Sequence, residues 1–217
     1  MIALPTYSRG QETANSITHG LGIVLSVAGL AVLVVLAALR GTAWHVVSFS
    51  VYGVTLVLLF TASTLYHSFR SPRVKRVLRV IDHSSIYLLI AGSYTPLTLV
   101  PLRGAWGWSL FGCVWAIALA GIFVKAYYTG RFRLLSTLVY LALGWLAVVA
   151  VKPLLGMLPV AGFLWLLAGG VVYSSGTVFY SWKKLPYHHA IWHLFVLAAS
   201  ICHYIAIVLY VLPSGGG

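Results

Sequence analysis

The chain of 217 residues is 61% hydrophobic and only 7% charged, which excludes an ordinary soluble domain. Apolar runs of about 20 residues recur along its whole length, and each is long enough to cross a bilayer as a helix. The formal charge of +12 does not indicate nucleic-acid binding, because the basic residues lie in short loops between apolar runs, where they act as topology signals. We therefore predict an all-α, multi-pass protein of the cell membrane.

Seven membrane-spanning helices are predicted in one domain, 16–212, between a cytoplasmic N-terminal segment, 1–15, and a short external tail, 213–217. The predicted spans are 16–39, 44–67, 80–102, 106–127, 134–151, 155–180 and 188–212. One side of this arrangement carries eleven basic residues: Arg9, Arg70, Arg73, Lys75, Arg76, Arg79, Lys125, Arg131, Arg133, Lys183 and Lys184. The other carries three: Arg40, Arg103 and Lys152. This asymmetry predicts a cytoplasmic N-terminus and an external C-terminus.

The last span begins with histidines at helical spacing. His189 and His193 are four residues apart, so both can point at one ion from the same helix face. His203 follows ten positions later, roughly 80° further round the helix, and could face the same interior. Imidazoles inside an apolar span are costly without partners and mark a candidate functional site. The run alone is equally consistent with a helix start whose histidines lie among lipid headgroups.

Other polar side chains converge on the same depth of the bundle. Glu12 and Asp82 are the two acidic residues of the chain. With the topology fixed by positive charge, both enter the membrane from the cytoplasmic side, as do Ser63 and His67 at the end of the second span and the histidine pair of the last. We therefore expect these side chains to meet in the cytoplasmic half.

Three neutral imidazoles with one open position form the ligand set of a catalytic zinc site. His67, His189 and His193 can supply it. Zinc in such a site lowers the pKa of its bound water toward ~7 and polarises a carbonyl. Asp82 is the candidate for orienting that water or moving its proton, and Ser63 could hold the water or a leaving oxygen. Other divalent ions would also accept these ligands.

Several motifs in order along the chain resemble the hemolysin III family, the bacterial branch of the progestin and adipoQ receptors, which include the adiponectin receptors. They extend from Glu12 to Tyr204 and are Glu12-x-x-Asn15-x-x-Thr18-His19, Ser63-x-x-x-His67, Asp82 through Gly92-Ser93-Tyr94-Thr95-Pro96, and His189-x-x-x-His193. The resemblance implies seven helices with a cytoplasmic N-terminus and a zinc ion near the cytoplasmic surface. It also implies kinship with alkaline ceramidases, which hydrolyse lipid amides.

The resemblance also assigns roles to individual residues. It makes His67, His189 and His193 the zinc ligands, and Asp82 and Ser63 partners of the zinc-bound water. Glu12, Asn15 and His19 match the motif of the first span, and we expect them to support the ligands or tie that span to the site. His203 resembles a recurrent family position, although a buried histidine with a purely structural role is the commoner explanation.

Three functions remain open at this point. The first is a zinc-dependent hydrolase of a lipid amide or ester, with a role in membrane lipid homeostasis. The second is a non-catalytic zinc-containing sensor or receptor, for which a lipid is the expected signal. The third is the cytolysis of the family's name, although the chain has no segment typical of a soluble pore-former. In each case the expected partners are membrane lipids, with homo-oligomerisation left open.

Overall fold

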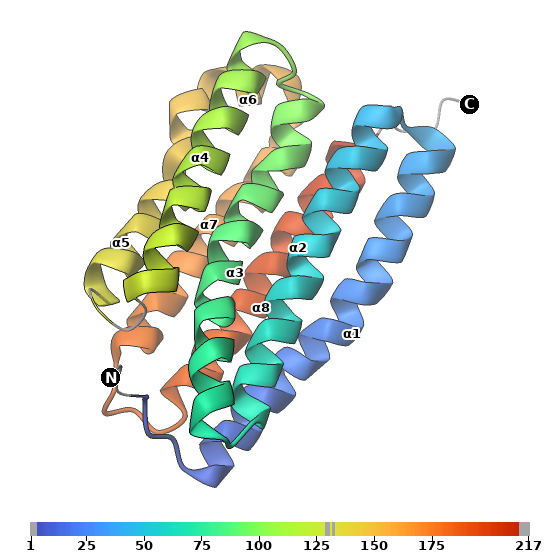
Figure 1. Ribbon diagram of the computed structural model, residues 1–217. Coiled ribbons are helices and arrows are strands. Elements are labelled where there is room, and N and C mark those ends of the chain that lie inside the picture. Colours follow the sequence, from blue (N-terminus) through green and yellow to red (C-terminus); the bar gives the residue numbers. More distant parts are fainter. Residues whose placement is uncertain (1–3, 129–130, 132, 213–217) are drawn as a thin grey trace.

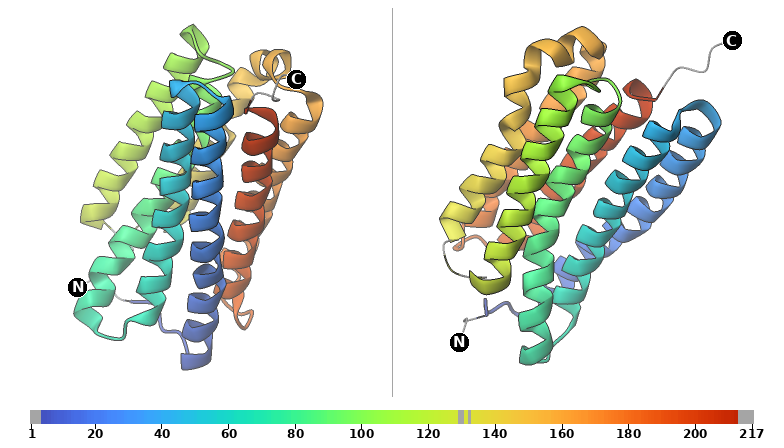
Figure 2. Two further views of the ribbon diagram at one scale, coloured as in Figure 1. Left: turned by 90° about the vertical axis from the view of Figure 1, so that its right-hand side faces the viewer. Right: turned by 45° about the horizontal axis from the view of Figure 1, so that its top comes forward.

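Helices make up every regular element of the computed structural model, which describes residues 4–128, 131 and 133–212 (Figure 1). In chain order they are α1 (Arg9–Arg40), α2 (Ala43–Ser68), α3 (Pro72–Leu99), α4 (Ala105–Tyr128), α5 (Arg133–Gly144), the 3-10 helix η1 (Trp145–Ala150), α6 (Val151–Met157), α7 (Val160–Ser181) and α8 (His188–Tyr210). The long helical segments run antiparallel to their chain neighbours, with α5, η1 and α6 together forming one such segment, and α1 packs against both α2 and α8 (Figure 2). The fold class is therefore the predicted all-helical bundle.

Six helical segments in the described part of the chain are long and apolar enough to cross a membrane. They are Arg9–Arg40, Ala43–Ser68, Ala105–Tyr128, Leu134–Met157, Val160–Ser181 and His188–Tyr210. At 28 residues α3 has sufficient length and packs between α2 and α4, but its first half carries basic residues and Asp82. A seventh crossing, by α3, remains a prediction.

Four helix boundaries differ from the predicted spans by five residues or more. The first helix begins at Arg9 and not at 16, and the third at Pro72 and not at 80; the fifth span continues to Met157, and α7 begins at Val160 and not at 155. The first helix begins at Arg9, because the Ser8 hydroxyl accepts a hydrogen bond from the Gln11 amide and the Gln11 side chain accepts one from Ser8 N. The fifth span does not end at Lys152 and Pro153. Pro153 is the third residue of α6, where the missing N–H has no partner within the helix in any case, so helical structure runs on to Met157.

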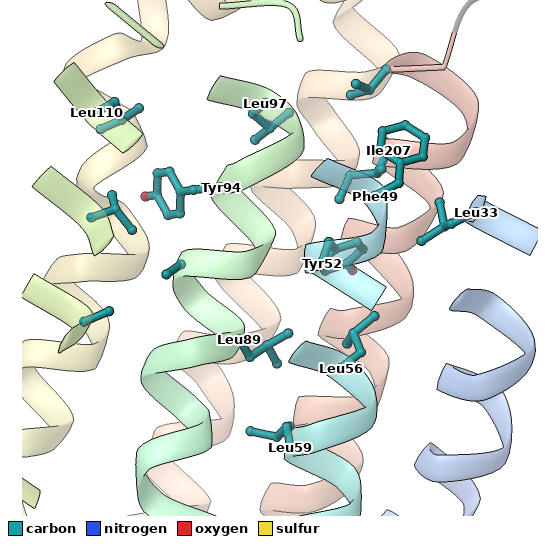
Figure 3. Packing of buried hydrophobic residues seen from close by; sticks show 14 of the residues in the cluster. Leu33, Phe49, Tyr52, Leu56, Leu59, Leu89, Tyr94, Leu97, Leu110 and Ile207 are labelled. Carbon is teal, nitrogen blue, oxygen red and sulfur yellow. The ribbon is translucent and has the colours of Figure 1, made fainter. Parts of the chain in front are cut away.

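The apolar core lies along the interior of the bundle, and its side chains point inward from several helices (Figure 3). Leu33, Phe49 and Ile207 are fully buried. On the outside, large apolar residues such as Val24, Phe123 and Leu164 are more than half exposed. An exterior of this kind is unfavourable in water and suits contact with lipid tails.

One end of the bundle gathers most of the basic residues. The start of α1, the α2–α3 turn, the end of α4, the start of α5 and the α7–α8 connection all lie there (Figure 1). We call it the basic end. The segments that meet there carry the eleven basic residues counted above, against three at the other end, so the bundle has the charge asymmetry that the sequence predicts. Its orientation in the membrane stays an expectation.

Candidate metal centre

Three histidines from two helices meet near the basic end. His67 is the second-last residue of α2, and His189 and His193 occupy one face of the first turns of α8. Each offers one potential ligand atom, and these atoms all lie within 4.8 Å of one another. His67 and His193 are 3% and 2% exposed, so the cluster is shielded from bulk solvent. The structure thus brings together the three predicted metal ligands.

Glu12, in the first turn of α1, fixes the orientation of His67. Its Oε2 lies 2.6 Å from His67 Nδ1, and its other oxygen pairs with the Lys75 ammonium. Because the ion-paired carboxylate accepts hydrogen bonds, Nδ1 carries the proton and Nε2 keeps its lone pair. This Nε2 is buried and makes no hydrogen bond within the described part of the chain. An imidazole with its outer N–H held by a carboxylate and its inner nitrogen free is typical of a metal ligand.

The backbone of α1 orients His193 in the same way. The carbonyl oxygen of Asn15 lies 3.1 Å from His193 Nδ1, and the Thr18 hydroxyl oxygen lies 3.2 Å from it. A carbonyl oxygen can only accept, so Nδ1 is the donor and Nε2 presents its lone pair. The Asn15 side-chain amide lies 3.3 Å from His67 Nδ1, so Asn15 contacts both ligands. One turn of α1 therefore positions histidines from two other helices.

His189 completes the set with less support. Its ring stacks on that of Tyr7, with 5.3 Å between the centroids, and its buried Nδ1 makes no hydrogen bond among the described residues. Three neutral imidazoles, two with lone pairs fixed by outer partners, match a three-histidine zinc site with an open fourth position. The buried, unpartnered Nε2 of His67 is costly without a ligand. The residues present therefore fit a zinc ion.

A cavity of about 150 Å³ opens beside the histidines and extends into the bundle. His189 and His193 line it together with Ser63 and Asp82. The Asp82 carboxylate hydrogen-bonds with the Ser63 hydroxyl and is close enough to His67 to interact with it electrostatically. Its Oδ2 also lies 3.5 Å from His83 Nδ1. Most of the wall is apolar, so the cavity can hold a hydrocarbon chain next to a carboxylate.

The remaining two predicted histidines have different positions. His19 stacks flat on His193, with centroids 3.5 Å apart and an interplanar angle of 14°, and lines the cavity. Nitrogen lone pairs lie in the ring plane, and the planes of the two stacked rings are nearly parallel, so His19 and His193 do not converge on one ion. His203 lies deeper, where its Nε2 donates to the Leu166 carbonyl oxygen at 3.2 Å and its ring packs against Gly169. The geometry gives His203 a packing role away from the metal cluster.

Sequence reasoning missed two residues that contact the site. Lys75 pairs with Glu12 and is only 9% exposed, although it counted above solely as a topology signal. Nothing in the basic segment Arg70–Arg79 distinguishes it from its neighbours. Tyr7 contacts His189 from the predicted cytoplasmic N-terminal segment, and no pattern in the sequence marks it.

Comparison with known proteins agrees with the motifs. A family profile described as Haemolysin-III related matches residues 7–204. The chain belongs to this family. It is 51% identical over 200 residues to the Hemolysin-3 homolog of Bacillus subtilis (strain 168), covering 92% of this chain and 94% of that protein. It is 50% identical over 204 residues to Hemolysin-3 of Bacillus cereus, covering 94% and 93%.

A more distant relative is human. The chain is 31% identical over 214 residues to the Monocyte to macrophage differentiation factor of Homo sapiens, covering 94% of this chain and 86% of that protein. The resemblance to hemolysin III and to the progestin and adipoQ receptors is therefore confirmed. With six helices suited to crossing a bilayer, this family member is a multi-pass protein of the cell membrane.

Proposed function

We propose that the protein is a zinc-dependent membrane hydrolase that cleaves an amide or ester bond of a lipid. The observation that carries the proposal is the three-histidine cluster, with two outer nitrogens held by α1, beside an apolar cavity that Asp82 also lines. A hydrolytic site needs an activated water, a group that moves protons and room for the substrate. These residues can supply each of them.

His67, His189 and His193 would hold the ion. When bound, zinc supplies an acidified water molecule and a positive charge that polarises the substrate carbonyl. Glu12 and Asn15 keep the imidazoles of His67 and His193 in the protonation state that binding requires.

Asp82 would carry the protons of the reaction. Its carboxylate would accept a proton from the attacking water as the water oxygen bonds to the acyl carbon. It would return that proton to the leaving nitrogen or oxygen as the bond between this atom and the acyl carbon breaks, which gives a fatty acid and an amine or alcohol. The Ser63 hydroxyl, hydrogen-bonded to Asp82, holds the carboxylate toward the cavity. The apolar wall accepts the acyl chain and excludes bulk water. With the basic end in the cytoplasm, as the basic residues favour, cleavage would take place in the cytoplasmic half of the membrane.

Lipid turnover by the full-length protein in reconstituted vesicles tests this proposal. Vesicles containing a panel of lipid amides and esters would be assayed for released fatty acid by mass spectrometry. We expect turnover by the wild type and by Cys113→Ala, a control on the exposed face of α4, and loss of turnover in Asp82→Asn and His193→Ala. Equal turnover in all four proteins would contradict the assignment. Stoichiometric zinc without turnover of any lipid would favour the non-catalytic sensor.

A further inference from the structure

The segment before α1 runs across the basic end of the bundle to the first residue of that helix (Figure 1). Its described part, residues 4–8, has no regular secondary structure, and we call it the strap. We propose that the strap is a lid over the metal centre and that, in the closed state, Tyr7 separates the histidines from the aqueous phase at the basic end. The inference rests on the metal centre of the proposed function but not on its hydrolytic activity.

Tyr7 lies against three histidine rings at once. Its ring stacks on that of His189, with an interplanar angle of 27°. Its centroid is also 5.9 Å from that of His67 and 6.2 Å from that of His188. His67 and His189 are candidate metal ligands from different helices, α2 and α8. One aromatic side chain of the strap therefore covers the place where the two helices bring their ligands together.

Tyr7 covers the ligand that is least enclosed by the helices. His67 and His193 are almost completely buried, whereas His189 is only partly buried. The first turns of α1 shield the other two ligands, because Glu12 contacts His67 and the Asn15 carbonyl oxygen contacts His193. The exposed edge of the metal centre is thus at His189, and the strap lies on that edge.

A second cavity, of about 190 Å³, lies beneath the strap. Residues 5–7 line it together with side chains from the ends of the helices. His83, Tyr180 and His189 line both this cavity and the apolar cavity of the metal centre. The two cavities are therefore neighbours that share part of their walls. A small polar species that moves from the basic end to the histidines would pass under the strap.

The strap can move without unwinding α1. The reciprocal hydrogen bonds between Ser8 and Gln11 fix the first residue of the helix, so Glu12 and Asn15 keep their places when the chain before Ser8 moves. Thr6 and Ser8 are exposed, and the strap has no helical hydrogen bonds of its own to break. Segments of this kind open locally at a low free-energy cost. Residues 4–7 are therefore suited to opening and closing about Ser8.

The lid gives the two cavities different roles. The apolar cavity accepts the acyl chain, as proposed above, and the cavity beneath the strap is the polar route. When the lid is closed, bulk water and competing ligands are kept from the histidines. When it is open, the metal ion can enter or leave, and so can the water that is consumed and the polar product of hydrolysis.

The rate of zinc release from the full-length protein in dodecyl maltoside tests the lid without any activity. The zinc-loaded protein is mixed with an excess of a soluble chromogenic chelator, and the zinc dissociation constant is measured separately by competition. The variants are Tyr7→Ala, which removes the ring, Tyr7→Phe, which keeps it, and Pro5→Gly, which keeps Tyr7 but loosens the strap. The matched control is Tyr127→Ala, which removes an exposed tyrosine of α4 from outside both cavities.

A lid changes the rates of zinc entry and release together, so it changes affinity little. We expect Tyr7→Ala to release zinc about tenfold faster than the wild type, with a dissociation constant within about threefold. Pro5→Gly should accelerate release about two- to fivefold, because glycine gives the strap more freedom. Tyr7→Phe and Tyr127→Ala should release zinc at nearly the wild-type rate. Pro5→Gly keeps the test decisive if Tyr7→Ala fails to fold.

Three results would overturn the lid. The first is release at the wild-type rate from both Tyr7→Ala and Pro5→Gly. The second is faster release from Tyr7→Ala with an equal loss of affinity, which would make Tyr7 a support for His189. The third is release from Tyr7→Phe as fast as from Tyr7→Ala, which would assign the effect to the hydroxyl group. Lipid turnover with any of these results would remove the lid and leave the hydrolase, and the expected release rates without turnover would do the reverse.

Discussion

Replacing Glu12 with glutamine isolates the carboxylate that orients a metal ligand. Glutamine keeps the size of the side chain and can still accept from His67 Nδ1 through its amide oxygen. It removes the negative charge from a 2.6 Å hydrogen bond and leaves the Lys75 ammonium without its partner, near the metal centre. Both effects disfavour a bound cation.

The expected loss of zinc affinity is about 10- to 100-fold, the usual effect of removing the outer partner of a histidine ligand, or about 1.4 to 2.7 kcal/mol. The Lys75 contribution favours the upper half of that range. Competition against a fluorescent chelator, with the purified protein in detergent, measures it. The double variant Glu12→Gln with Lys75→Met should recover part of the affinity, because the unpaired ammonium is gone.

Thr13→Ala is the control, because Thr13 is exposed on the same turn of α1 and its hydroxyl bonds only to the Arg9 carbonyl oxygen. Thermal unfolding of the metal-free proteins separates metal affinity from stability. A zinc affinity for Glu12→Gln within about threefold of wild type would refute the assigned role, since such a change is under 1 kcal/mol.

Three further predictions concern the proton carrier, the packing and the topology. Asp82→Asn should keep stoichiometric zinc, measured by elemental analysis. Its lipid turnover should fall about 100-fold or more, because asparagine cannot accept the proton. Loss of the metal in this variant would instead make Asp82 a ligand. Gly169→Ala should destabilise the protein by about 1–3 kcal/mol in thermal unfolding, because its Cβ would overlap the His203 imidazole. Gly170→Ala, whose Cβ would meet Trp145 at an ordinary 3.5 Å, should be nearly neutral, and equal effects would contradict the packing argument. In a background of Cys113→Ala and Cys202→Ala, an impermeant maleimide applied to intact cells should label Arg103→Cys but not Arg73→Cys, and the opposite pattern would reverse the orientation.

The metal ligands could be predicted because their signals are local or depend on topology alone. His189 and His193 have helical spacing. Because successive spans alternate in direction, the end of the second span, with His67, lies at the same depth as the start of the last span. Glu12 and Asn15 followed from the motif of the first span. The sequence did not predict which atom of each residue contacts a histidine. That depends on where the first turns of α1 lie relative to the cluster and on which oxygen faces each histidine Nδ1.

The second cavity at the basic end, of about 190 Å³, could not be predicted, because it is assembled from segments with no common pattern. Arg79 and Lys183 read as two of eleven topology signals, and Tyr66 as an apolar residue of a span. The burial of Arg79 and Tyr66 depends on side-chain packing between neighbouring helices, which periodicity does not give. The break of the fifth span into α5, η1 and α6 escaped prediction for a related reason: a proline near a helix start and a proline at a helix end look alike in sequence.

The metal content of the purified protein is the measurement that tests the account most directly. Elemental analysis would compare the wild type with His67→Ala, His193→Ala and the control His203→Ala, which removes a buried histidine from outside the cluster. The account predicts about one zinc per chain in the wild type and the control, and none in the other two, as for a single three-histidine site. A wild type without stoichiometric metal, or a metal that survives His67→Ala and His193→Ala, would contradict it.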